Sequence, residues 1–241
     1  INQAQGSAHQ PKWIEKSPTV GSRRMVCHFE NSIVSVAHIA AIRVALEKSV
    51  GSFVMRIRQC NVKIGRYSYE GPCTQICVFR LELTSTNGHR SVGNRSVTTY
   101  LILDCLLHRL QAPCIREFTL RVEEGLLAID WIGCMNVLIA FLSQATTTAS
   151  LCVCVQFIGL DRRLLGHFGF EYTIRSFLSL VHLVGKTVTL SLHFRSVSKA
   201  ALCGLGFRLQ DNIFGATFSL MEDGVVFLKS GAPHPHHSHS G

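Results

Sequence analysis

Charged residues are scarce in this chain, and acidic residues are the scarcest. The 241 residues include 24 lysines and arginines but only 15 aspartates and glutamates, so the formal net charge is +9 at pH 7. Runs of like charge are lacking, and 47% of the residues are hydrophobic. This composition excludes an intrinsically disordered chain. The length suits one large domain or two small ones.

Long apolar runs are lacking as well. The longest, residues 131–142, contains Asn136 and falls short of the ~20 residues that cross a bilayer. We therefore expect no membrane partner. The first residues show no secretory signal pattern, so we expect a cytoplasmic or nuclear protein whose ten cysteines stay reduced.

The basic residues do not form the patterns that bind nucleic acid. A basic balance can indicate such a partner, but here Lys and Arg are scattered, and the densest groups are pairs such as Arg23-Arg24 and Arg162-Arg163. No ladder of aromatic residues alternates with basic ones, as stacking on single-stranded bases would require. We therefore do not expect a nucleic-acid partner.

Motifs for catalysis and for cofactors are incomplete. Residues 185–187, GKT, end like a phosphate-binding loop, but Leu180 stands where the leading glycine is required. Residues 204–206, GLG, lack the third glycine of a dinucleotide-binding turn. No Gly-x-Ser-x-Gly elbow places a nucleophilic serine. The sequence therefore predicts neither an enzyme nor a cofactor.

Cysteine and histidine patterns do not predict a metal site. Cys73 with Cys77 and Cys152 with Cys154 are the close cysteine pairs, whereas a structural zinc site needs two knuckles with two to four intervening residues. Cys152 and Cys154 share one strand parity, so we expect both on one side of a strand. The histidine-rich tail offers no preorganised geometry and would bind a metal only adventitiously.

What the chain does contain is a recurring helix-then-strand unit, clearest in residues 100–122. Leucines there recur at three- and four-residue spacing along one helical face: Leu103, Leu106, Leu107 and Leu110. Pro113 ends the helix near Gln111. Apolar residues then alternate with polar ones, as in a strand with one buried face: Phe118, Leu120 and Val122.

Similar units precede and follow this one. The expected strand centres, 24 to 41 residues apart, are Met55, Phe79, Leu120, Val153 and Leu190. Helical faces are expected within 39–46, 137–142 and 174–184, with Arg43 on the outer side of the first and residues 123–130 as a connection. Such irregular recurrence is typical of a leucine-rich solenoid with degenerate repeats.

The two ends of the chain depart from the repeat. We expect a polar lead-in over residues 1–22, a single repeat-like domain over 23–230, and a mobile His/Pro-rich tail over 231–241. Near the end of the domain, apolar residues flank Asp223-Gly224 in the pattern of a hairpin that caps the fold.

Three short sequence segments are similar to those of a known family. Residues 45–49, ALEKS, precede the strand 53–57, FVMRI; residues 107–115, LHRLQAPCI, run into 118–120, FTL; and residues 141–144, FLSQ, precede 151–155, LCVCV. Together they resemble the degenerate leucine-rich region that follows the F-box in many fungal F-box proteins. The resemblance covers about residues 20–195, and an F-box is not evident in residues 1–40.

The resemblance implies a substrate receptor of an F-box ubiquitin ligase, which performs no catalysis itself. Its partners would be a target protein and, if an F-box lies upstream of Ile1, the ligase adaptor. We therefore predict an α/β fold, an irregular leucine-rich-repeat-like solenoid with a parallel sheet, that recognises a protein. The binding candidates are strand residues that point away from the helices: Arg56, Arg58, Arg80, Glu82, Arg121 and His193.

Two alternatives stay open at this point. Asn87-Gly88 and Asp223-Gly224 are typical hairpin turns, which would also suit an antiparallel all-β sandwich or jelly roll, that is, a compact β-rich binding or capsid-like domain. The untidy repeats and many cysteines would also fit an orphan chain without a selected function.

Overall fold

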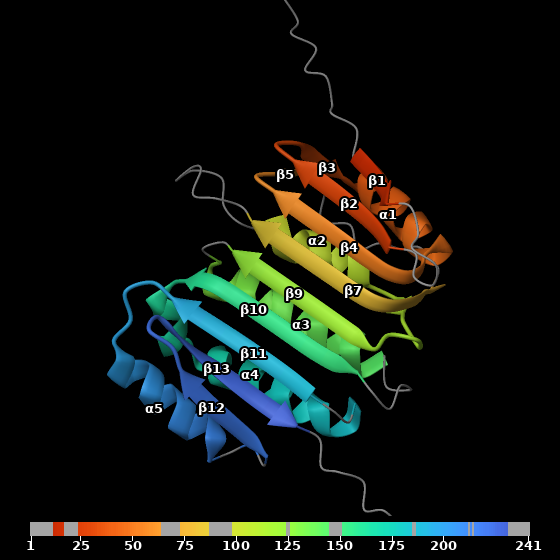
Figure 1. Ribbon diagram of the computed structural model, residues 1–241. Coiled ribbons are helices and arrows are strands. Elements are labelled where there is room, and N and C mark those ends of the chain that lie inside the picture. The colour runs from red at the N-terminus through yellow and green to blue at the C-terminus, as the bar shows by residue number, and fades with distance from the viewer. Residues whose placement is uncertain are drawn as a thin grey trace, which may run out of the picture.

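The described residues form a sheet of nine strands, with helices packed against it (Figure 1). The computed structural model describes residues 12–16, 24–63, 73–86, 98–123, 126–144, 151–184, 187–211, 213 and 215–230. In spatial order the strands are β1 (Lys12–Lys16), β2 (Arg24–Glu30), β4 (Val50–Arg58), β7 (Cys77–Thr86), β9 (Glu117–Glu123), β10 (Cys152–Leu160), β11 (Thr187–Phe194), β13 (Gly224–Ser230) and β12 (Ala216–Leu220).

The central strands of this sheet are parallel and lie in chain order. Parallel pairing joins β2 to β4, β4 to β7, β7 to β9, β9 to β10 and β10 to β11. Among the described strands, antiparallel pairing occurs only where β1 joins β2 and where β13 joins β11 and β12. The protein is therefore a mixed α/β fold with a large, mostly parallel sheet, and the antiparallel sandwich or jelly roll does not describe it.

Helices cover one face of the sheet. They are α1 (Val36–Lys48), α2 (Thr98–Leu107), α3 (Ala128–Gln144), α4 (Phe168–Val184) and α5 (Lys199–Gln210), with a short 3-10 helix η1 (Arg162–Gly166) before α4. Helices α1 to α4 pack beside one another in chain order, and Figure 1 shows α2, α3 and α4 behind the sheet. We call the opposite side of the sheet the open face. Two short strand pairs, β3 (Ile33–Ser35) with β5 (Asn61–Lys63) and β6 (Thr74–Gln75) with β8 (Leu110–Gln111), lie beside the main sheet.

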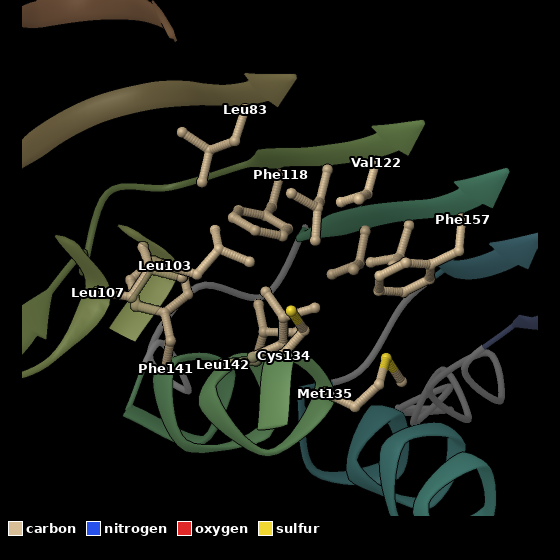
Figure 2. Close-up of a cluster of buried hydrophobic side chains, with 14 of the residues drawn as sticks. Leu83, Leu103, Leu107, Phe118, Val122, Cys134, Met135, Phe141, Leu142 and Phe157 are labelled. Atoms are coloured by element: carbon tan, nitrogen blue, oxygen red, sulfur yellow. The ribbon is translucent and has the colours of Figure 1, made fainter. Parts of the chain in front are cut away.

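The core lies between the sheet and the helices. Alternate residues of each strand point to one face, and the strand register aligns them into buried rows. One such row consists of Cys27, Met55, Leu83, Leu120, Val155, Leu190 and Phe227. Figure 2 shows side chains of the sheet, among them Leu83, Phe118, Val122 and Phe157, turned toward Cys134, Met135, Phe141 and Leu142 of α3.

The expected strand centres all fall within observed strands, but one side chain points the other way. Strict alternation along this strand would place Phe79 on the same side as Leu81, yet the side chain of Phe79 is 45% exposed while Leu81 is buried. The register shifts between Gly51 and Ser52, which pair with Val78 and Arg80, so Phe79 is an extra residue in β7. A β-bulge of this kind reverses the alternation locally, and strand parity read from sequence cannot reveal it.

Two helices differ from the sequence prediction. Helix α3 begins at Ala128, within the segment expected to be a connection, because Trp131 is fully buried against Phe157 and Phe170, at ring distances of 5.8 and 4.9 Å. Helix α5 was not predicted because its glycines resemble loop residues. Gly206 is required there, since an added Cβ would lie 2.4 Å from the ring of Phe218.

Arg43 was expected on the outer side of α1, and this was wrong. Its side chain is 1% exposed and donates hydrogen bonds to three carbonyls at the end of α2, those of Cys105 (3.4 Å), Leu106 (3.0 Å) and His108 (2.7 Å). Carbonyls at a helix C-terminus lack intrahelical donors and favour a cation. Arg43 therefore joins two successive helices.

The predicted C-terminal hairpin is confirmed, with Phe218 opposite Phe227 and Leu220 opposite Val225. Strand β1 lies within the expected polar lead-in. The Asn87-Gly88 turn, residues 185 and 186, and the tail 231–241 lie outside the described residues.

Candidate functional site

The open face presents one aligned side chain from each parallel strand. The strand register places six polar residues in one line, which we call the central row: His28, Arg56, Thr84, Arg121, Gln156 and Ser191. They come from β2, β4, β7, β9, β10 and β11 in that order. Neighbouring strands lie about 4.8 Å apart, so the row runs straight across the sheet; its last member, Ser191, is buried.

All six residues that the sequence singled out lie on this face. Arg56 and Arg121 occupy the central row on either side of Thr84, about 10 Å apart by strand spacing. Arg80 and Glu82 precede Thr84 on β7, and both are accessible, whereas Arg58 lies at the end of β4.

His193 lies apart from the other five, at the end of β11. Its Nδ1 is 2.9 Å from Oδ1 of Asp223, in the turn between β12 and β13. The structure therefore groups the five charged candidates on β4, β7 and β9, and places His193 in a separate histidine–aspartate pair near the C-terminal hairpin.

Most of the grouped charges are paired on the open face itself. Arg80 forms an ion pair with Glu117 across β7 and β9, and Arg121 pairs with Glu123 along β9. Arg58 lies 3.3 Å from Glu30 across β4 and β2. Within the described part of the chain, Arg56 makes no hydrogen bond or ion pair, and its side chain is exposed. Arg24, exposed at the start of β2 on the same face, likewise makes none there, so Arg24 and Arg56 are the arginines of this face that are most available to a partner.

Positive and negative charges nearly balance on the strands from β2 to β9. The strand register places five arginines outward: Arg24, Arg56, Arg58, Arg80 and Arg121. It places four glutamates beside them: Glu30, Glu82, Glu117 and Glu123. We call this region the charged half of the open face. Such a mixture offers paired donors and acceptors rather than a uniform field.

The open face of β10, β11, β13 and β12 differs in kind. Its outward residues include Cys152, Cys154, Thr187, Thr189 and Leu228. Among the residues described there, none that points outward is Lys, Arg, Asp or Glu. We call this region the neutral half. Both cysteines are exposed free thiols on one side of β10, as their spacing predicted, and partial burial raises the pKa of Cys154.

Sequence reasoning missed the neutral members of the central row. Thr84, Gln156 and Ser191 share the outward parity of their strands. They were not among the candidates because only charged residues and a histidine were selected. His28 lies in β2, which is not among the strands expected from the sequence. Their common parity with Arg56 and Arg121 was the available signal, and only the strand register shows that they align.

Neither a metal centre nor a bilayer-spanning helix emerges from the described residues. No three histidine, cysteine or acidic side chains there come close enough together to hold a metal ion. None of the helices there has the length and apolar character to cross a membrane. No family model, curated protein or solved structure matches this chain.

Proposed function

We propose that this chain is a protein-recognition module and that the charged half of the open face is its contact surface. The observation that carries the proposal is the central row: six strands in chain order each contribute one polar residue, and four of these residues lie in the charged half: His28, Arg56, Thr84 and Arg121. A surface of this kind lets a partner contact successive units at a regular spacing.

The charge distribution supports a protein partner over a nucleic acid. A phosphate backbone binds through an excess of cations, yet four glutamates alternate with five arginines on the charged half. Their carboxylates would repel phosphates while offering acceptors to the lysines and arginines of a protein. Complementary charges at such an interface give specificity and faster association.

The more specific proposal is a degenerate leucine-rich solenoid that serves as the substrate receptor of an F-box ubiquitin ligase. The chain-order sheet with helices on one face supports the solenoid, and the three segments at 45–57, 107–120 and 141–155 support the family. In this role the open face holds the target, and other subunits modify it. The target is therefore bound without being chemically changed by this chain.

Charge reversal on the open face tests the recognition role. Partners recovered by affinity purification with the wild-type chain are compared with those of the double variant Arg56→Glu/Arg121→Glu. Lys48→Glu, at the exposed end of α1, is the matched control. We expect the double variant to bind a purified partner at least ~10-fold more weakly by calorimetry, because opposed charges across an interface become like charges.

Three outcomes distinguish the general proposal, recognition by the open face, from the specific one, a ligase substrate receptor. Equal binding by the double variant and the wild type would contradict recognition by the open face, and so would equal losses with Lys48→Glu. Co-purification of the full-length product with the ligase adaptor tests the ligase role separately. Failure there, with open-face binding intact, would leave a recognition module outside this ligase class.

A further inference from the structure

A pocket of about 740 Å³ lies away from the open face, at the carboxyl ends of β10 and β11. These two strands are parallel neighbours, so the segments that follow them lie side by side. Its lining comes from η1, from the turn after β11, and from the start of α5: Arg162, Arg163, Leu165, Gly166, His167, Ser196, Val197, Ser198 and Ala201.

The ionised side chains that line this pocket are cations. Arg162 and Arg163 line it, and Lys199 follows directly after the lining residue Ser198. No carboxylate is among the described lining residues. The neighbouring Asp161 is already bound by Arg163, with Nε–Oδ1 and Nη2–Oδ2 distances of 3.1 and 2.8 Å. These hydrogen bonds lower the pKa of Asp161 to about 2, so it is ionised and engaged at neutral pH.

Arg162 is the cation that remains available in the pocket. Its side chain is exposed, and within the described part of the chain it makes no hydrogen bond or ion pair. Its positive charge acts on Asp161 only through space. A guanidinium in this state retains its planar set of donors for a ligand, and that set fits the oxygens of phosphate and carboxylate groups.

Neutral donors surround the same space. His167 Nδ1 accepts a hydrogen bond from the amide of Gly169 at 3.2 Å, so in the neutral ring the proton is on Nε2, which is left as a donor. Ser196 and Ser198, which also line the pocket, each carry a hydroxyl group. Ser198 also caps the 12-residue helix α5 through the amide of Ala201 at 3.3 Å. The amides of Ala201 and Leu202 are therefore engaged by Ser198, whereas those of Lys199 and Ala200 before them have no intrahelical acceptor and favour an anion.

We propose that this pocket binds a phosphate monoester. Arginine, hydroxyl and helix amides suit a tetrahedral oxyanion with several acceptor oxygens. The volume exceeds that of a phosphate group and lies within the ~300–1,000 Å³ typical of small-molecule sites. The organic part of the ligand would rest on the apolar lining side chains, Leu165, Val197 and Ala201. This site is separate from the open face and does not depend on its role.

Calorimetric titration at constant ionic strength tests the proposal with four probes: inorganic phosphate, glucose 6-phosphate, a phosphoserine peptide, and the same peptide without phosphate. We expect the phosphate compounds to bind and the plain peptide not to bind. Arg162→Gln should weaken phosphate binding at least ~10-fold, since one charge-assisted donor is lost. Arg116→Gln, an exposed arginine packed on Phe79 near the start of β9, is the matched control and should bind as the wild type.

The relative affinities identify the source of the phosphate. Tighter binding of the phosphoserine peptide would indicate a modified protein, and tighter binding of the sugar phosphate would indicate a free metabolite; either result supports the site. Absence of binding by every phosphate compound would overturn it. Unchanged binding by Arg162→Gln, with thermal unfolding equal to that of the wild type, would also overturn it.

Discussion

On the open face, strands β2 to β9 carry arginines and glutamates, whereas β10, β11, β13 and β12 carry thiols, hydroxyls, an amide, an imidazole and aliphatic side chains. On the opposite side the two halves are alike, because every row that faces the helices is filled mainly by buried apolar residues. Packing thus constrains one side of each strand in the same way throughout. Packing does not constrain the outward residues in this way, so they can differ between the two halves. These differences indicate which half binds a partner.

The helices behind the two halves of the sheet also pack on one another differently. Between α1 and α2, the buried guanidinium of Arg43 reaches backbone carbonyls. Between α3 and α4, Trp131 packs on Phe170 with ring centres 4.9 Å apart. The stability of the polar junction depends on its hydrogen bonds, because a buried carbonyl without a donor is costly. The stability of the aromatic junction depends on side-chain volume, because a smaller side chain leaves a cavity. The two junctions therefore differ in how they tolerate substitution.

The largest effect should be the same in both halves. Phe118→Ala in β9 and Phe157→Ala in β10 each remove a fully buried ring, which contacts Phe141 or Trp131. We expect each to lower the free energy of unfolding by about 3–5 kcal/mol. Urea denaturation followed by circular dichroism would measure both. A loss below about 1 kcal/mol for either one would indicate that its half lacks this core.

The next effect should distinguish the two helix junctions. Arg43→Met keeps most of the side-chain volume but leaves the carbonyls at the end of α2 without their donor. We expect a loss of about 2–4 kcal/mol in the free energy of unfolding, against less than about 0.5 kcal/mol for the exposed Lys48→Met. Equal small losses for both variants, by the same denaturation measurement, would mean that Arg43 is not buried.

The smallest effect concerns the ion pairs of the charged half. Arg80 and Glu117 are each about half exposed, so Arg80→Gln should cost at most ~1 kcal/mol. The difference from the wild type should vanish at about 1 M salt, where screening acts within a few ångströms. Thr189→Val, on the outward side of the neutral half, is a control whose effect should not depend on salt. A salt-independent loss for Arg80→Gln would show that the ion pair does not form.

Sequence alone predicted the strands better than the site, for physical reasons. Period-two alternation is a local pattern, so β9, β10 and β11 could be identified from their own residues. The start of α3 at Ala128, the burial of Arg43 and the exposure of Phe79 depend on partners distant in the chain: Phe170 for Trp131, the end of α2 for Arg43, and the register with β4 for Phe79. The central row is likewise defined only by the register among six strands.

The order and direction of the strands support every proposal for the open face, and Cys154 provides a direct test of both. Cys154 is on β10. In the parallel register it lies opposite Thr119 of β9 on one side and Thr189 of β11 on the other. Strand spacing of about 4.8 Å falls within the range that a disulfide spans. After mild oxidation, peptide mass spectrometry should find residue 154 joined to the new cysteine in Thr119→Cys and in Thr189→Cys, but not in Thr217→Cys on β12. Linkage to Thr217→Cys, or to neither neighbour, would contradict the sheet on which the recognition surface depends.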